Sequence, residues 1–237
     1  MKQKRYRALC VLLSTLLLAS GTLTGCGSGQ ASGVSKETQT EDSAKKSSSN
    51  KSTSNKEKAP EIEGLEYQKT MNLTYATEFN VFYYKGGYKL LDVKDDRQYL
   101  IVPEGKKAPK GLDGDIIVLK QPLDHIYLAA TSAMALFDSI DGLDHIRMSG
   151  AQASDWYVEH AKEAMEAGDI LFAGKYSEPD YEMLIKEDCD LAIESTMILH
   201  TPKVQEMIED LDIPVFIDRS SYEGHPLGRT EWIKAYA

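Results

Sequence analysis

Short apolar runs alternate with longer stretches of mixed polarity over the second half of the chain. The apolar runs have strand character and cover residues 116–119, 126–130, 146–148, 170–173, 191–193 and 213–217. The stretches between them carry helix start and stop residues and predict helices over 131–140, 155–167, 179–186 and 202–211. Strand and helix alternating four times indicate an α/β fold, with a mostly parallel sheet and helices on both of its faces.

Individual residues set the predicted helix ends. Ser154 and Thr201 are placed to cap the second and fourth helices with their hydroxyls, and Pro202 suits the first helical position. Gly168 follows the second helix and is the residue type that most readily closes one.

Before this alternation, the pattern predicts a small antiparallel β region over residues 61–112. Aromatic and β-branched runs at 79–84 and 88–93 flank Lys85-Gly86-Gly87, a good hairpin turn, and 99–102 adds a third strand. The α/β lobe then covers 113–230, and 231–237 begins one more helix. From residue 61 onward the chain has the length of one ordinary domain.

The first 25 residues have the pattern of an export signal. Lys2, Lys4, Arg5 and Arg7 precede a 12-residue apolar run over 8–19, which is too short to span a bilayer as a mature helix. Leu23-Thr24-Gly25-Cys26 resembles the lipobox of bacterial lipoproteins, which implies cleavage before Cys26 and a lipid on its sulfur. We therefore expect a signal peptide over 1–25 and a protein anchored to the extracytoplasmic face of the cell membrane. The alternative is an ordinary secreted protein with a chance cysteine.

Residues 26–60 have the composition of a disordered tether. The stretch from 27 to 60 contains nine serines, several lysines and no aromatic residue, and so cannot bury enough apolar surface to fold. As a flexible coil its ends would lie about 32–35 Å apart. Disorder without a function would have the same composition, and the lipobox favours the tether.

Charge and cysteine content limit the possible partners. After removal of 1–25 the chain has 23 basic and 37 acidic residues, a formal charge of −14, which disfavours nucleic acid and anionic headgroups as partners. Attachment to the membrane must therefore come from the lipid on Cys26. Cys189 is then the one other cysteine of the mature chain, and its acidic neighbours indicate a structural thiol.

Ligands of an open parallel sheet bind beyond the carboxyl ends of its strands, which selects five loops. These loops carry flat apolar side chains and hydrogen-bond donors, a mixture that suits a medium-sized organic ligand. The candidate ligand-binding residues are Thr131, Trp156, Lys175, Tyr176, Thr196, His200, Tyr222 and Arg229. Alternatively, these aromatic side chains merely cover the sheet edge. No cofactor is indicated.

Enzyme signatures are scarce, and we expect a protein without catalytic residues. No phosphate-binding Gly-rich loop, nucleophile elbow or HExxH motif occurs. Two alternatives remain open. Ser220 or Ser221 with His225 would make an extracellular hydrolase, and His200 with a carboxylate such as Glu194 would bind a metal ion directly.

Residues 115–237 resemble the first lobe of ABC-transporter substrate-binding proteins of the cobalamin and ferric-siderophore type. The stretches that carry this resemblance are IYLAATS at 126–132, GKYSEPDYE at 174–182, DLAIEST at 190–196, IPV at 213–215 and SYEGHPLGRTEW at 221–232. The resemblance implies an iron–siderophore, haem or corrinoid ligand, handed to a membrane permease driven by an ATPase. It also implies that Glu182 docks to the permease, although Tyr181 stands where the family commonly has leucine.

The chain ends where this resemblance would place the helix between two lobes. Glu231-Trp232-Ile233-Lys234 looks like its first turn, and the sequence stops at Ala237. We therefore expect the first lobe only, from a fragment or a truncated gene, with poor ligand affinity by itself. An interaction or signalling lipoprotein that needs only one lobe is a further alternative.

Overall fold

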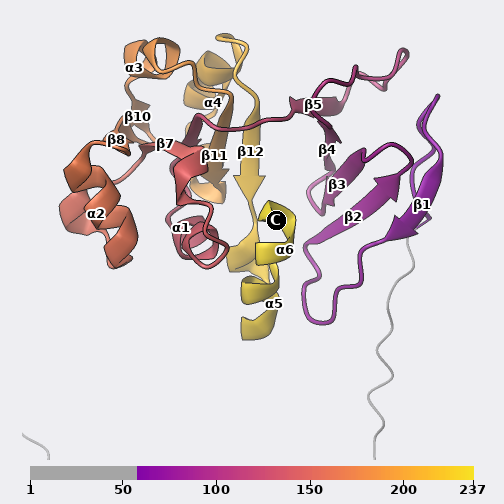
Figure 1. Ribbon diagram of the computed structural model, residues 1–237, viewed down its shortest axis with the longest axis horizontal. Coiled ribbons are helices and arrows are strands. Elements are labelled where there is room, and N and C mark those ends of the chain that lie inside the picture. Colours follow the sequence, from indigo (N-terminus) through magenta and orange to yellow (C-terminus); the bar gives the residue numbers. More distant parts are fainter. Residues whose placement is uncertain (1–57) are drawn as a thin grey trace, which may run out of the picture. The chain divides into compact units, whose positions relative to one another are not determined.

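The alternating strands and helices form a five-stranded parallel sheet, sheet B, in the computed structural model, which describes residues 58–237 (Figure 1). Its strands are β6 (Ile126–Leu128), β7 (Ile146–Ser149), β8 (Leu171–Phe172), β11 (Leu191–Ser195) and β12 (Val215–Asp218). They lie in the order β12-β11-β6-β7-β8, so the chain moves outward from β6 to β8 and then returns to the other side of β6. This reversal between β6 and β11 is the switch point of a doubly wound sheet.

Helices lie on both faces of sheet B, as the alternation predicts. The principal ones are α1 (Thr131–Asp138), α2 (Glu159–Ala167), α3 (Tyr181–Lys186) and α4 (Pro202–Glu209). Leu128 belongs to the same buried cluster as Met134 of α1. Its neighbour Tyr127 points to the other face, in a cluster with Leu184 of α3 and Ile208 of α4. Successive side chains of a strand point to opposite faces, so this short strand is buried on both.

A second five-stranded sheet, sheet A, precedes sheet B in the chain. Its strands, in spatial order, are β1 (Tyr67–Thr70), β2 (Phe79–Tyr84), β3 (Lys89–Val93), β4 (Arg97–Val102) and β5 (Ile116–Lys120). The hairpin between β2 and β3 is confirmed, and both Gly86 and Gly87 have the positive φ that such a turn requires.

One strand differs from the sequence-based expectation. We expected residues 116–119 in the α/β part, whereas β5 lies in sheet A and pairs in parallel with β4. Residues 103–115 give the connection the dozen or so residues that a parallel neighbour needs. Sheet A is therefore mixed rather than wholly antiparallel.

Buried side chains from the two sheets pack together in one hydrophobic cluster. Val81 and Leu91 of sheet A belong to the same cluster as Ile193 and Phe216 of sheet B. The opposite face of sheet A packs against the segment around Ile62, in a cluster of its own. The β region therefore contributes one face to the core of the α/β part.

Several helix ends differ from the predicted ones. A 3₁₀ turn, η2 (Ala153–Asp155), occupies the predicted start of the second helix, and α2 begins only at Glu159. The Thr201 hydroxyl donates to the Ile198 carbonyl and does not cap α4. Gly168 does close α2, in the left-handed conformation. The remaining short elements are η1 (Leu143–His145), β9 (Gly174–Lys175), β10 (Glu178–Pro179), η3 (Thr196–His200) and η4 (Ser220–Tyr222).

The C-terminal helix also begins earlier than predicted. Two short helices, α5 (Pro226–Glu231) and α6 (Ile233–Tyr236), stand where we expected one helix from 231, and Trp232 lies between them. The Trp232 side chain is fully buried, with its ring 4.8 Å from that of Phe79 of β2.

Two buried carboxylates, one in α5 and one in the segment before it, connect this part of the chain to the loop between β1 and β2. Glu231 accepts the backbone N–H groups of Thr74, Tyr75 and Ala76 at 2.7–3.0 Å. Glu223 accepts those of residues 77 and 78 at 2.8–3.0 Å and the indole N–H of Trp232 at 2.9 Å. Hydrogen bonds to a charged acceptor are about twice as strong as neutral ones. We call these two side chains the Glu223–Glu231 pair.

The surroundings of Glu231 lower its pKa to about 2. Burial acts in the opposite direction and raises the pKa, but the Lys234 ammonium at 2.7 Å and the three backbone N–H groups outweigh it. Glu231 is therefore ionised in the folded protein at neutral pH.

We expect Glu231→Gln to lower the free energy of unfolding by about 2–3 kcal/mol at pH 7, because the amide keeps only one acceptor oxygen. The Glu231 pKa is depressed from 4.5 to about 2, so the ionic contribution is present above pH 4.5 and is lost as the pH falls through 2. Urea unfolding at several pH values measures both effects. Glu206→Gln, at an exposed position of α4, is the control, and equal stabilities for both variants at pH 7 would refute the assigned role.

Candidate functional site

The carboxyl ends of the five strands of sheet B lie at one edge, because all five are parallel. β12 points toward the end of the molecule that carries α5 and α6 (Figure 1). The five predicted loops leave from this edge, which we call the carboxyl edge. Gly150 allows two of these loops to pass closely, because a Cβ there would lie 2.7 Å from the Cα of Ala129.

Asp218, the last residue of β12, joins three segments at the carboxyl edge. Its buried carboxylate accepts the Ser220 hydroxyl at 2.6 Å, the Ser132 hydroxyl at 3.3 Å and the hydroxyl of Tyr236. Burial raises the pKa of Tyr236 well above its usual value, and the negative charge of Asp218 raises it further. The Tyr236 hydroxyl therefore stays protonated and remains a hydrogen-bond donor. Asp218 thereby holds together the start of α1, the start of η4 and the end of α6.

Trp156 and its neighbour Tyr157 have opposite environments. Trp156, a predicted ligand contact, is only 8% exposed, and its indole N–H donates to the Ser149 hydroxyl at 3.1 Å. Tyr157 is fully exposed. The flat apolar side chain that this loop presents to solvent is therefore Tyr157, and Trp156 belongs to the core.

Large hydrophobic side chains remain exposed in the loops at the carboxyl edge. Tyr157 follows β7, Met197 and Leu199 follow β11, and Tyr222 and Leu227 follow β12. The loop between β1 and β2 contributes Tyr75, whose ring stacks 4.8 Å from that of His225. Exposed apolar side chains concentrated in one region are typical of a binding surface.

The predicted donors fall into two groups. Thr131, Lys175 and His200 are exposed, whereas Tyr176 and Thr196 are half-buried. Arg229 is exposed and donates to the Ser221 carbonyl at 3.2 Å.

The predicted aromatic contact Tyr222 is 57% exposed, but one of its faces is covered. The guanidinium of Arg219 lies 4.4 Å from the Tyr222 ring centroid. The same guanidinium forms a bond of 2.9 Å with Glu78, so its charge is already neutralised by the protein. Tyr222 can therefore offer a ligand only its other face, stiffened by the stacked arginine.

Glu194 is the least expected group near this edge. It is fully buried in β11, and neither of its carboxyl oxygens has a hydrogen-bond partner among the described residues. Burial raises the Glu194 pKa to about 8. Burial also raises the pKa values of Tyr127 and Tyr181, and the negative charge of ionised Glu194 raises them further. A carboxyl group in these surroundings is mostly protonated at neutral pH.

The geometry gives little support to the metal-ion and hydrolase alternatives. Within residues 58–237 no group of three or more His, Cys, Asp or Glu side chains is arranged to hold a metal ion. The Ser220 hydroxyl donates to Asp218, while His225 accepts the backbone N–H of Leu227 at the start of α5. Cys189 is half-buried, and burial raises its thiol pKa to about 12, as expected of a structural thiol.

The described part has two further cavities. One, of about 450 Å³, lies between sheet A, the strands of sheet B and the C-terminal residues 234–237, and is lined mostly by apolar side chains such as Val81, Leu91 and Ile126. The other, of about 470 Å³, lies beside the β2–β3 turn.

Sequence reasoning missed three features of this region: the Asp218 hydrogen bonds, the unpartnered carboxyl of Glu194 and the Glu223–Glu231 pair. Asp218 could have been found as an acidic residue ending an apolar strand, followed by two serines. The Glu223–Glu231 pair lies within the stretch SYEGHPLGRTEW, but no local pattern shows which backbone groups its carboxylates accept.

Comparison with known proteins gives one distant relative. The chain is 27% identical over 198 residues to an uncharacterized lipoprotein of Methanocaldococcus jannaschii, an alignment that covers 73% of this chain and 45% of the relative. The chain thus spans about half the length of the curated relative it matches. No family model matches the sequence.

The predicted signal peptide, Cys26 and most of the predicted tether lie outside the described residues. Among residues 58–237, no helix has both the length and the apolar composition that crossing a bilayer requires. The similarity to a lipoprotein is consistent with attachment of this protein to a membrane by a lipid.

We expect the stability of the protein to depend on the ionisation of Glu194. Its pKa is raised from 4.5 to about 8 on folding, so the folded state is favoured while the group is protonated, and this contribution is lost as the pH rises through 8. Glu194→Gln should remove this dependence, which amounts to at most about 5 kcal/mol. Thermal unfolding from pH 4 to 9 measures it, with Glu166→Gln on the exposed side of α2 as control. Parallel pH profiles for wild type and Glu194→Gln would contradict the prediction.

Proposed function

We propose that this protein is the lipid-anchored, extracytoplasmic substrate-binding component of an ABC importer, and that its cargo is an iron–siderophore complex, haem or a corrinoid. The observation that carries the proposal is the carboxyl edge of sheet B, where five loops bring exposed apolar side chains and hydrogen-bond donors to one place. Open parallel sheets bind their ligands at this edge.

The chemistry of the carboxyl edge suits a flat or chelated organic ligand with some negative charge. Tyr157 and Tyr222 supply aromatic surface, and Lys175 and Arg229 supply cations that reach solvent. Aromatic side chains bind apolar rings, and a few charged donors fix their orientation. In this proposal the site binds its ligand without transforming it chemically.

We propose that the ligand contacts Thr131, Lys175, Tyr176, Thr196, His200, Tyr222 and Arg229. Tyr157 replaces Trp156 in this set, because Trp156 is buried with its indole N–H satisfied by Ser149. The hydrogen bonds of Asp218 and of the Glu223–Glu231 pair hold the loops, so that the ligand meets a surface already formed.

Docking to the permease is assigned to Glu182 in this proposal. Glu182 lies in the first turn of α3, is exposed, and follows Asp180, which caps the helix by accepting the Met183 N–H at 3.0 Å. A carboxylate held on a capped helix can direct association with a basic partner surface. The partners are then a membrane permease and its ATPase.

The membrane attachment is assigned to a lipid on Cys26. The basic start, the apolar run and the lipobox support it, and so does the similarity to a protein described as a lipoprotein. Two or more acyl chains on one residue are enough for stable anchoring.

We expect Tyr157→Ala and Tyr222→Ala each to weaken ligand binding about tenfold, because each removes an exposed aromatic face worth about 1 kcal/mol or more. The measurement is an absorbance titration of the detergent-purified lipoprotein with a ferric siderophore, haem and cyanocobalamin in turn. Ile185→Ala is the matched control, since Ile185 is as exposed as Tyr222 but lies at the end of α3. Unchanged affinity in both tyrosine variants, or an equal loss in the control, would count against the proposed site.

We expect Cys26→Ser to move the protein from the membrane fraction to the soluble extracytoplasmic fraction, because position 26 then has no thiol to carry the lipid. Fractionation and mass spectrometry of the N-terminal peptide measure this change. Cys189→Ser serves as control and should remain in the membrane fraction. Membrane retention of the Cys26→Ser protein would show that something other than the lipid holds it.

A further inference from the structure

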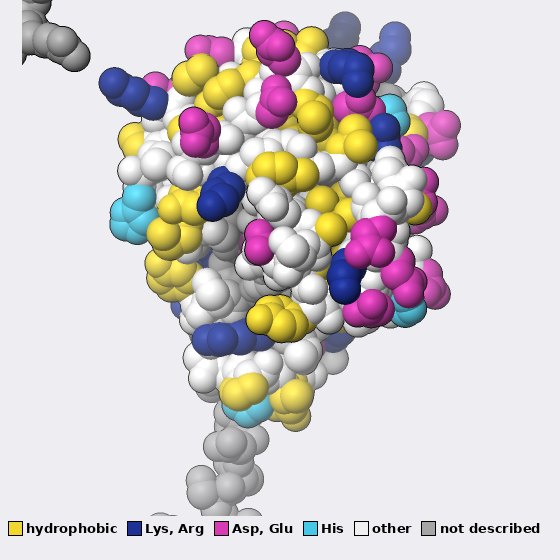
Figure 2. Space-filling view, turned by 90° about the vertical axis from the view of Figure 1, so that its left-hand side faces the viewer, with side chains coloured by type: hydrophobic (Ala, Val, Ile, Leu, Met, Phe, Trp, Pro, Cys, Tyr) yellow, Lys and Arg dark blue, Asp and Glu magenta, His cyan; other side chains and the backbone are white. Residues whose placement is uncertain are grey.

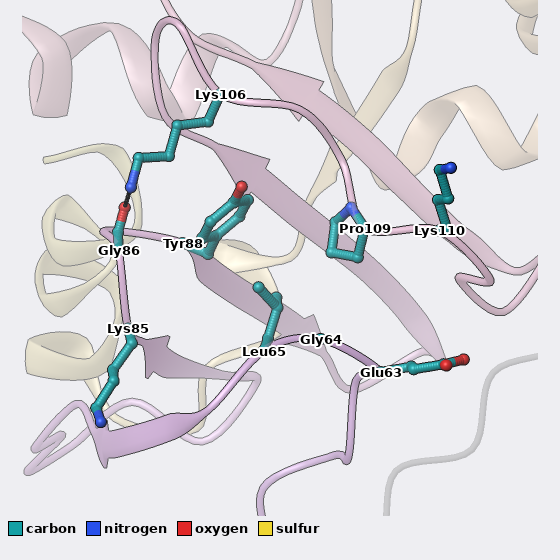
Figure 3. Close-up of a pocket in the computed structure, with 9 residues that line it drawn as sticks. All are labelled: Glu63, Gly64, Leu65, Lys85, Gly86, Tyr88, Lys106, Pro109 and Lys110. Carbon is teal, nitrogen blue, oxygen red and sulfur yellow. Dashed lines mark hydrogen bonds between the residues drawn. The ribbon is translucent and has the colours of Figure 1, made fainter.

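The cavity of about 470 Å³ beside the β2–β3 turn is bordered by lysines. Three segments line it: the stretch before β1, the turn itself and the loop that follows β4 (Figure 3). The lining residues are Glu63, Gly64, Leu65, Lys85, Gly86, Tyr88, Lys106, Pro109 and Lys110. Three lysines thus line the cavity, and Glu63 is the one acidic residue among the lining residues.

The position of Lys106 depends on the turn. Its ammonium donates to the Gly86 carbonyl at 2.7 Å and lies 5.6 Å from the ring centroid of Tyr88 (Figure 3). A Cβ at position 86 would lie only 2.8 Å from that ammonium, so glycine permits the approach. The Tyr88 hydroxyl in turn donates to the Lys107 carbonyl at 2.9 Å, which fixes the loop against the hairpin. None of these contacts neutralises the Lys106 charge.

Lys85 and Lys110 complete the basic border. Lys85 forms an exposed pair with Glu66 at 2.6 Å, a contact that is weak in water. Lys110 is exposed and lies on the far side of the cavity, across from Lys85 (Figure 3). We call Lys85, Lys106 and Lys110 the lysine border.

The lysine border lies where the described chain begins. Tyr84 donates its hydroxyl to the Pro60 carbonyl at 2.6 Å, and Ile62 packs into the cluster behind β2 and β3. This attaches the segment that leads back to Cys26 directly beside the cavity. If Cys26 carries a lipid, this is the part of the fold closest to the membrane along the chain.

The charge of the described chain is divided unevenly. Residues 58–112 contain nine Lys and Arg against eight Asp and Glu, whereas residues 113–237 contain nine against twenty-five. Figure 2, which views the side of α2 and α3, shows acidic side chains gathered along one edge of that face. An anionic surface therefore repels the α/β part strongly and the β region hardly at all.

We propose that the lysine border rests on the anionic phospholipid surface of the membrane to which the protein is anchored, with lipid phosphates beside the lysine side chains. The carboxyl edge, on the strongly acidic part, is then held away from the lipid. The inference rests on the lipid anchor of the proposed function but not on the identity of the cargo. The anchor concentrates the protein at the surface, so weak contacts suffice to orient it.

Lysine footprinting of the acylated wild-type protein in vesicles tests this orientation. Amine acetylation rates are measured by mass spectrometry in vesicles rich in phosphatidylglycerol and in vesicles of phosphatidylcholine alone. We expect acetylation of Lys85, Lys106 and Lys110 to be about fivefold slower on the anionic vesicles, from about 1 kcal/mol per lysine at such a surface. Lys162, Lys186 and Lys203, in the acidic part, are internal controls and should react equally in both. The protection should disappear at about 1 M salt, where the Debye length is about 3 Å.

Three outcomes would overturn the inference. Equal rates in both vesicle types for a protein that floats with the vesicles would leave the anchor intact and refute the orientation. Equal protection by millimolar inorganic phosphate on neutral vesicles would show a soluble-phosphate site instead. Failure of the wild-type protein to float with any vesicle would refute the anchor itself, and with it the membrane contact.

Discussion

Two carboxylates in a buried setting are the constraint on which the rest of this structure depends. Glu223 and Glu231 together accept five consecutive backbone N–H groups of residues 74–78. Buried N–H groups without partners would cost free energy, and a buried carboxylate without donors would cost more. The carboxylates and the backbone N–H groups therefore satisfy one another, although some 145 to 157 residues of chain separate them. Sheet A and the end of the α/β part consequently move as one body, with Tyr75 beside His225.

The same principle organises the carboxyl edge of sheet B. Asp218 accepts hydroxyls from the loops after β6 and β12 and from the C-terminal helix, so its charge is satisfied inside the fold. Glu78 does the same for Arg219, which then supports one face of Tyr222. This edge presents exposed apolar side chains to solvent, together with donors such as Lys175 and His200. A surface held by internal hydrogen bonds and left apolar outside is suited to bind a ligand without first rearranging.

Glu194 departs from this pattern, because its carboxyl group is buried without a partner among the described residues. The lysine border also departs from it, because its charges lie at the surface. Glu194 is buried with no partner among the described residues, so its free energy depends on whether it is protonated. The three lysines of the lysine border are exposed to solvent. Lys106 binds only a neutral carbonyl, and Lys85 forms only a weak, exposed ion pair with Glu66. One group thus makes the stability depend on pH, while the other gives the β region its difference in charge from the strongly acidic remainder.

The sequence by itself determined the features that arise from neighbouring residues. The alternation of apolar runs predicts the α/β order, Gly86-Gly87 predicts the hairpin turn, and Gly168 predicts the end of α2, because each depends on local backbone preference. Only the tertiary structure decided that Tyr157 rather than Trp156 is exposed, and that β5 pairs with β4. Burial and strand pairing depend on partners distant in the chain, which no local pattern encodes. For the same reason, the sequence showed that carboxylates were present near its end but not which groups they would hold.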